Sequence, residues 1–230
     1  MRQIVLDTET TGLDWRTGDR VIEIGCIELD GRRRSQQYFH CYLNPERAVD
    51  PGAMAVHGLT DEFLADKPKF AELVSTFLDF VRDAELIIHN ASFDVGFLNN
   101  ELQLLDLPPI EKLCGNIIDT LKMARDLRPG RKNNLNALCA EFAVDNSNRE
   151  LHGALLDAEL LADVYLAMTR GQNSLLIDFG TTAGASVAIA TEHPPLRVLR
   201  ASEDELAGHE KVLAEVDKQS QGKCLWSASQ

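Results

Sequence analysis

The sequence predicts an α/β fold in which a mixed sheet of five strands is flanked by helices. Short β-branched runs alternate along the chain with longer segments that carry apolar residues at helical spacing. The first run, residues 4–6, is uncharged and typical of a strand in the middle of a sheet. The 230 residues are 44% hydrophobic and 26% charged, and no apolar run approaches the length of a membrane span. The five cysteines are scattered and form no C-x-x-C pair, which fits a reducing cytoplasm. We therefore expect a cytoplasmic globular protein with no membrane partner.

Five strands are predicted, and they lie at residues 4–6, 21–29, 37–43, 86–88 and 116–119. The first three should form an antiparallel unit, because Asp30-Gly31 is a hairpin turn signal between the second and the third. Arg32, Arg33 and Arg34 follow this turn, and we expect them to be solvated.

Helices are predicted where a capping residue precedes an apolar stripe. Three helices are predicted from their ranges, at residues 70–81, 121–127 and 154–169. Three more are predicted from their caps: a short helix capped by Thr60 or Asp61, a helix capped by Ser92 that runs towards Pro108, and a helix capped by Asn134. Residues 56–60 are expected to form a loop.

The composition changes after residue 171. Residues 178–199 are rich in small and polar side chains without a helical stripe, which predicts a flexible linker. Ser202 and Glu205 have the spacing of a capping box, so a helix should begin there. The predicted parts are a folded domain over residues 1–171, a short peptide at 172–177, a linker at 178–199 and a helical tail at 200–230.

Asp7 and Glu9 stand one residue apart at the end of the first strand. Side chains alternate along a strand, so both carboxylates should point to the same face. Two negative charges on a core strand repel each other and resist desolvation, which a hard divalent cation such as Mg²⁺ or Mn²⁺ would offset. The alternative is that the strand ends at Asp7 and both acids lie in water.

Three further side chains complete a candidate site. Asp94 should lie in the first turn of a helix that follows a strand, where α/β proteins commonly assemble sites. His152 precedes Asp157 by five residues at the start of another helix. Taken singly, each has an ordinary explanation: a carboxylate near a helix N-terminus, a loop histidine and a solvated acid.

Together these motifs resemble the DEDD exonucleases of the histidine subtype, most closely those that proofread for replicative DNA polymerases. The matching segments are residues 7–12, 56–58, 89–94 and 151–158. The resemblance implies a ribonuclease-H-like fold and 3′→5′ hydrolysis that releases mononucleotides from mispaired primer ends. It further implies that two divalent ions, Mg²⁺ or Mn²⁺, are held by Asp7, Glu9, Asp94 and Asp157. His152 would be the general base, because an imidazole with a pKa of about 6.5 can accept a proton at neutral pH.

The resemblance also implies binding residues. Thr10, His57, Asn90 and Phe93 resemble positions that line the pocket for the terminal nucleotide, although Phe93 is equally well explained as a core aromatic. Gln172, Leu175, Leu176 and Ile177 resemble a peptide that binds a sliding clamp, or else form an ordinary packed chain end. The tail would bind the polymerase catalytic subunit of a replisome through Leu206, Leu213 and Trp226, and a small accessory subunit is a further possible partner.

The charge balance limits how DNA could bind. The formal net charge is −13, which argues against a broad basic surface for nucleic acid. Arg125, Arg128, Arg131 and Lys132 form the one concentrated basic stretch, which either touches phosphates or is a solvated loop.

Two other functions are compatible with the same residues. An exoribonuclease that trims RNA 3′ ends would share all five catalytic residues, but it would need no tethering tail. An adaptor without activity would need the tail, but it would not need the four acids and His152.

Overall fold

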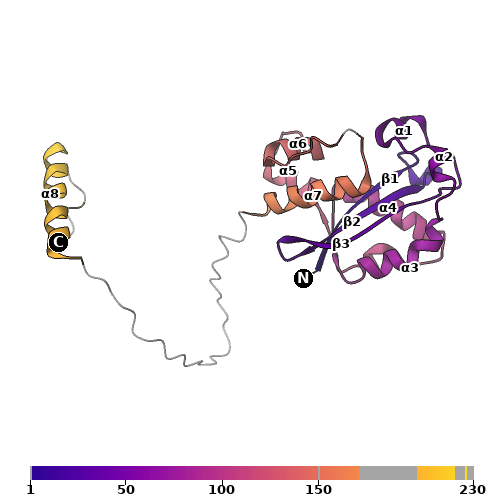
Figure 1. Ribbon diagram of the computed structural model, residues 1–230, viewed down its shortest axis with the longest axis horizontal. Helices are drawn as coiled ribbons and strands as arrows, with labels where there is room; N and C mark the ends of the chain where they lie inside the picture. The colour runs from indigo at the N-terminus through magenta and orange to yellow at the C-terminus, as the bar shows by residue number, and fades with distance from the viewer. Residues whose placement is uncertain (1, 150, 171–200, 221–225, 227–230) are drawn as a thin grey trace, which may run out of the picture. The chain divides into compact units, whose positions relative to one another are not determined.

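The computed structural model describes residues 2–149, 151–170, 201–220 and 226. The chain divides into two compact units, residues 1–179 and residues 180–230. Figure 1 shows that the first unit contains a sheet flanked by helices, whereas the described part of the second contains a single helix.

The sheet of the first unit is mixed and has the order β3-β2-β1-β4-β5. The strands are β1 (Arg2–Thr10), β2 (Val21–Asp30), β3 (Arg33–Tyr42), β4 (Glu85–Ile88) and β5 (Asn116–Asp119). The first three pair antiparallel through the predicted hairpin, while β1, β4 and β5 run parallel. The predicted five-stranded mixed sheet is therefore confirmed.

Helices cover both faces of this sheet because the side chains of β1 alternate. Ile4 and Leu6 pack in one core cluster with Phe77 and Phe97, whereas Val5 packs in a second cluster with side chains from the last three helices of the unit. The helices are α1 (Pro51–His57), α2 (Asp61–Leu64), α3 (Phe70–Val81), α4 (Ala91–Gln103), α5 (Thr120–Leu127), α6 (Leu135–Phe142) and α7 (Ala154–Met168), with short 3-10 turns at Trp15–Thr17 and Ile110–Lys112.

Two predictions about helix starts are wrong. The segment expected to be a loop at residues 56–60 begins inside α1, because Asp50 caps the helix through the amide of Gly52 and Pro51 stands in its first turn. Helix α4 begins at Ala91 and not after Ser92, since Asn90 is its N-cap in the left-handed region with φ of 65°. The cap at Thr60 and the place of Asp94 in the first turn of α4 are confirmed.

The arginines after the hairpin turn are exposed, as predicted, but two of them also bind the last helix of the unit. Arg33 is the first residue of β3. The Arg32 guanidinium donates hydrogen bonds to Thr169 Oγ1 at 3.0 Å and to the Leu166 carbonyl at 2.5 Å. Arg34 pairs with Glu159 and Asp163 on α7. The hairpin thus contacts α7 from Glu159 to the C-cap Thr169, through interactions that local sequence does not reveal.

The second unit contains α8 (Glu203–Gln219), which begins with the predicted capping box of Ser202 and Glu205. No residue of this helix is buried, and Leu206 is 53% exposed. Leu213 is partly buried, and Trp226 is 81% exposed. The predicted peptide at 172–177 and the predicted linker at 178–199 lie outside the described residues. Within the described parts, no helix has both the length and the apolar composition needed to span a membrane.

Candidate active site

The candidate site lies where two parallel strands end. Because β1 and β4 run parallel, their carboxyl ends meet at one edge of the sheet. Asp7 and Glu9 are at this end of β1, on the same side as Val5, which packs in the core cluster shared with α7. The chain turns sharply after β4 through Asn90 and enters α4, which carries Asp94. The strand order therefore brings together acids that are 85 residues or more apart in sequence.

Asp94 is buried and held directly against β1. Its Oδ1 accepts hydrogen bonds from the Thr8 amide at 3.1 Å and from the Thr8 hydroxyl at 2.7 Å. The side chain is only 3% exposed, so these two bonds compensate part of its desolvation. They also leave Oδ2 free of any interaction with Thr8, so that oxygen is available as a ligand.

Asp157 reaches the site because α7 begins very close to the sheet. In the antiparallel ladder Gly25 of β2 stands opposite Asp7. A Cβ atom at Gly25 would lie 2.3 Å from the backbone of Ala154, the first residue of α7. Only glycine therefore permits this approach, which places Asp157 in the first turn of α7 above the acids of β1.

Arg149 binds this last carboxylate. Its Nε and Nη2 atoms donate to the two oxygens of Asp157, each at 2.5 Å, and both side chains are 5% exposed. Nη2 also lies 3.0 Å from Nδ1 of His152. Because an arginine can only donate, Nδ1 is the acceptor in that contact and carries no proton. Arg149 is thus a buried counter-cation within the acidic cluster.

The four acids and His152 line one cavity of about 530 Å³, together with Arg149. Ligand atoms of Glu9, His152 and Asp157 lie within 4.8 Å of one another, close enough to share a metal ion. The structure therefore brings together all five residues predicted to be catalytic. It also makes His152 a candidate ligand, a role that the sequence did not suggest.

Burial is the main cause that raises the pKa values of three of the acids, and charge repulsion adds to it. Burial, followed by the charges of Asp94, Asp157 and Glu9, raises the pKa of Asp7 well above its ordinary value. Burial and the charge of Asp157 raise the pKa of Glu9 to about 8. Burial raises the pKa of Asp94 to about 7, against the hydrogen bonds from Thr8. Such a site favours a bound cation, and its oxygen donors suit a hard divalent metal ion.

His152 lies at the mouth of this cavity with 45% of its side chain exposed. Burial and the nearby charge of Arg149 lower its pKa, while Asp157 raises it. Its backbone amide donates to the carbonyl of Val56 in α1 at 3.1 Å. The helix that the sequence analysis missed therefore anchors the loop that carries the predicted base.

A second cavity of about 490 Å³ adjoins the first, sharing Thr8, Glu9, Leu13 and Phe93 with it. Three of the four predicted substrate-binding residues, Thr10, His57 and Phe93, line it. His57 is buried, and its Nε2 has no hydrogen-bond partner among the described residues. Asn90 instead lines the catalytic cavity.

Phe93 and Thr10 also have structural roles. The ring of Phe93 packs against Phe97 with centroids 4.9 Å apart while it lines both cavities, so the two explanations for Phe93 are compatible. The hydroxyl of Thr10 donates to the carbonyl of Gly12 at 2.6 Å and so stabilises the turn after β1.

The sequence analysis missed Arg149. It stands in a loop, eight residues before its partner Asp157, and no periodicity or motif marks it. A basic residue close to the H-x-x-x-x-D segment is the one signal that could have drawn attention to it.

Comparisons with known proteins identify the family of this chain. Residues 4–165 match the exonuclease family model RNase_T. The DNA polymerase III subunit epsilon of Salmonella typhimurium is 50% identical over 99% of this chain and 98% of its own length. The Escherichia coli K12 protein of the same name is 48% identical over the same shares.

Solved structures show the same fold. Exonuclease X in complex with 5′ overhanging duplex DNA is 27% identical and has a TM-score of 0.58, covering 73% of this chain and 90% of that one. Exonuclease I is 19% identical with a TM-score of 0.65, covering 75% of this chain and 42% of that one, and it supports the fold alone. The ribonuclease-H-like architecture is thereby confirmed. The chain belongs to the exonuclease family, in the branch of the DNA polymerase III epsilon subunits.

Proposed function

We propose that this chain is a cytoplasmic replisome subunit that removes mispaired nucleotides from the 3′ end of a DNA primer, with Asp7, Glu9, Asp94, Asp157 and His152 as its catalytic residues. The observation that carries the proposal is the convergence of four acids on one cavity, with the pKa of Glu9 raised to about 8. The purified chain should hydrolyse 3′-mismatched DNA in the presence of Mg²⁺. Preferential cleavage of short RNA would instead favour the exoribonuclease, and no cleavage of either substrate would favour the adaptor.

The proposed cofactor is a pair of divalent ions, Mg²⁺ or Mn²⁺, held by Asp7, Glu9, Asp94 and Asp157. Such ions make a water nucleophilic and stabilise the leaving oxygen of the phosphodiester. The donor set fits this role, because all four side chains offer carboxylate oxygens. Three of these residues, Glu9, Asp94 and Asp157, are less than 10% exposed.

The protein's own groups would do the rest of the chemistry. His152 would accept the proton of the attacking water, since its lowered pKa keeps it neutral at pH 7. The cavity lined by Thr10, His57 and Phe93 would hold the terminal nucleoside. The unpartnered Nε2 of His57 would meet a polar atom of that nucleoside, and Phe93 would offer its ring face for stacking.

Replacing Arg149 by Met should tighten Mn²⁺ binding and destabilise the metal-free protein. The guanidinium occupies both oxygens of Asp157 and therefore competes with a metal ion for that ligand. Without it the acids lose their counter-charge, and breaking a buried pair costs on the order of 3 kcal/mol. Isothermal titration with Mn²⁺ and thermal melts in EDTA measure the two effects.

Arg34→Met is the matched control for this variant. Arg34 pairs with Glu159 and Asp163 on the surface, where all three side chains are at least 36% exposed. Such pairs contribute about 0–1 kcal/mol, so stability should barely change and Mn²⁺ affinity should stay the same. If Arg149→Met left both quantities unchanged, Arg149 would not be a counter-cation.

The proposed partners are the polymerase catalytic subunit, through the tail, and a sliding clamp, through Gln172, Leu175, Leu176 and Ile177. In support, Leu206 and Val216 are exposed along α8, and an isolated helix of this length is marginal in water. Trp226 adds a large exposed aromatic of the kind enriched at interface hot spots. A tethered exonuclease would gain a high local concentration at the primer end.

Truncation after Gly171 should preserve exonuclease activity on free DNA but abolish co-elution with the polymerase subunit. All residues of the catalytic cavity and of the three core clusters precede residue 171. Size-exclusion chromatography and a nuclease assay measure the two properties. A truncated chain that still forms the complex would show that the tail is not the tether.

Two full-length variants separate the partner sites. Leu206→Asp with Leu213→Asp should abolish polymerase binding and preserve clamp binding. Alanine at Gln172, Leu175, Leu176 and Ile177 should have the opposite effect.

A further inference from the structure

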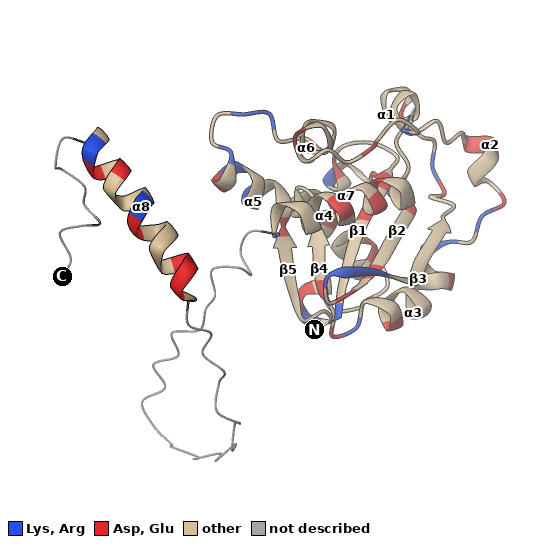
Figure 2. Cartoon of the chain, turned by 60° about the vertical axis from the view of Figure 1, so that its left-hand side comes forward, with Lys and Arg blue, Asp and Glu red and all other residues tan. Residues whose placement is uncertain are grey.

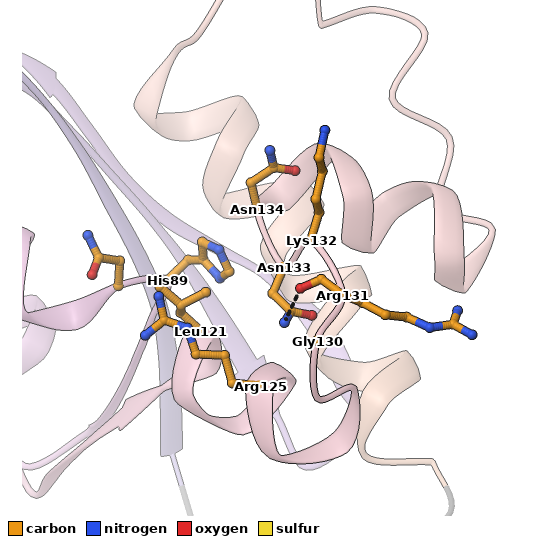
Figure 3. A pocket seen from close by; sticks show the side chains of 9 residues that line it. His89, Leu121, Arg125, Gly130, Arg131, Lys132, Asn133 and Asn134 are labelled. Atoms are coloured by element: carbon orange, nitrogen blue, oxygen red, sulfur yellow. Dashed lines mark hydrogen bonds between the residues drawn. The ribbon is translucent and has the colours of Figure 1, made fainter.

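A third cavity, of about 800 Å³, lies beside the catalytic one. Figure 3 shows its lining, which comes from the end of β4, from α5 and from the loop that leads into α6. His89, Asn90 and Asn134 line both this cavity and the catalytic cavity, so the two are neighbours. We call it the basic cavity, because Arg125, Arg131 and Lys132 line it and its described lining contains no acidic residue.

The positive charge of the basic cavity stands out in a chain with a net charge of −13. Figure 2 shows Lys and Arg residues along the loop between α5 and α6, as well as on other elements such as β3. Among the described residues, neither Arg125 nor Lys132 forms an ion pair, whereas Arg131 lies 3.3 Å from Glu141. Burial lowers the pKa of His89, which is therefore neutral at pH 7. Two exposed cations are thus available to a ligand.

Other residues of the loop form its scaffold. Asn133 is buried, donates to the Arg131 carbonyl at 3.0 Å and accepts from Arg128 at 3.3 Å. Arg128 is in turn held by Glu141 at 3.0 Å. This network shapes the loop without using Arg125 or Lys132. In Figure 3 the side chain of Arg125 extends from α5 towards His89, which also lines the catalytic cavity.

The three cavities form a row with the catalytic one in the middle. Phe93 is among the residues that join it to the 490 Å³ cavity, and His89 is among those that join it to the basic cavity. The 490 Å³ cavity has the apolar walls Leu13, Ala53 and Val56 suited to a nucleoside. A strand whose terminal nucleoside lies there, with the bond to be cut at the carboxylates, enters the basic cavity when it continues along this row.

We propose that the basic cavity binds the phosphates of the substrate strand on the 5′ side of the bond that is cut, through Arg125 and Lys132. This inference rests on the proposed nuclease function and adds the direction in which the strand runs. The cations would also offset the repulsion between an anionic strand and an acidic protein. Since the contacts are to phosphates, they carry no base preference.

The test compares two substrates with Arg125→Gln/Lys132→Gln. One substrate is a single-stranded oligonucleotide, and the other is the p-nitrophenyl ester of thymidine 5′-monophosphate, which has no nucleotide on the 5′ side. The variant should lose kcat/KM on the oligonucleotide but keep its kcat/KM on the ester. On the oligonucleotide, salt should weaken the wild type more than the variant, because the variant has lost two phosphate contacts. The ratio of wild-type to variant kcat/KM should therefore fall by about sevenfold between 50 and 200 mM salt.

The matched control is Arg33→Gln/Arg82→Gln, which removes the same charge at two residues that line none of the three cavities, and it should affect neither substrate. Arg125→Lys/Lys132→Arg, which keeps the charges, should restore most of the oligonucleotide activity. An unchanged kcat/KM on the oligonucleotide, or an equal loss on both substrates, would overturn the proposal. Failure of the wild-type chain to cleave either substrate would instead overturn the proposed nuclease function.

Discussion

Replacing Asp7 by Asn and Glu9 by Gln together should abolish metal-dependent hydrolysis. Both side chains keep their shape but lose the charge that holds a divalent ion at the end of β1. The variant loses several kcal/mol of electrostatic stabilisation of the transition state. We therefore expect kcat to fall by at least about 10³-fold. A nuclease assay over a range of Mn²⁺ concentrations measures this, because weakened binding alone would be rescued at high metal.

The same variant should be more stable than the wild type when metal is absent. A carboxyl group with a raised pKa binds its proton more tightly in the folded state. It therefore costs stability once the pH exceeds the unfolded pKa of about 4, and the cost grows until the pH passes the folded pKa. That value is about 8 for Glu9 and about 7 for Asp94.

Thermal melts in EDTA between pH 5 and pH 9 measure this effect. The melting temperature of the wild type should fall as the pH rises, and that of the double variant should fall less. Glu62→Gln/Asp66→Asn, two exposed acids near α2, is the control and should behave as the wild type. Nuclease activity of more than a few per cent in the Asp7/Glu9 variant would contradict the metal-site assignment.

The sequence predicted those parts of the site that depend on short-range periodicity. The alternation of a strand places Asp7 and Glu9 on one face, and a helix start places Asp157 in a first turn. The strand after Glu85 and the helix behind it likewise indicated Asp94 at a sheet edge. Each of these inferences needed only a few neighbouring residues.

The missing parts depend on contacts between distant segments. Nothing local indicates that Gly25 must face Ala154, or that the His152 loop must bond to Val56. The start of α1 did have local signals, namely the N-cap Asp50 and Pro51 in the first turn. The helix is too short, however, for its apolar residues to form a recognisable stripe. Arg149 is recognisable only once the burial of Asp157 shows that a counter-charge is required.

His152→Gln should lower kcat by about 10²–10⁴-fold, the usual loss on removal of a general base. Burial and Arg149 hold the pKa of His152 below its ordinary value. The wild-type rate should therefore rise with pH to a plateau that begins below neutrality, because the base must lose its proton before it can act. This acidic limb should disappear in the variant. Rates between pH 5 and pH 9 at saturating metal and substrate measure it.

Mn²⁺ affinity decides between the two roles that the geometry of His152 allows. A general base can be lost without loss of metal binding, whereas a ligand that shares an ion with Glu9 and Asp157 cannot. We expect titration calorimetry to give the same Mn²⁺ affinity for His152→Gln and for the control His209→Gln on α8. Markedly weaker binding by His152→Gln would make the histidine a ligand. An unchanged rate and pH profile would exclude the histidine from the reaction and leave it only its contacts with Arg149 and Asp157.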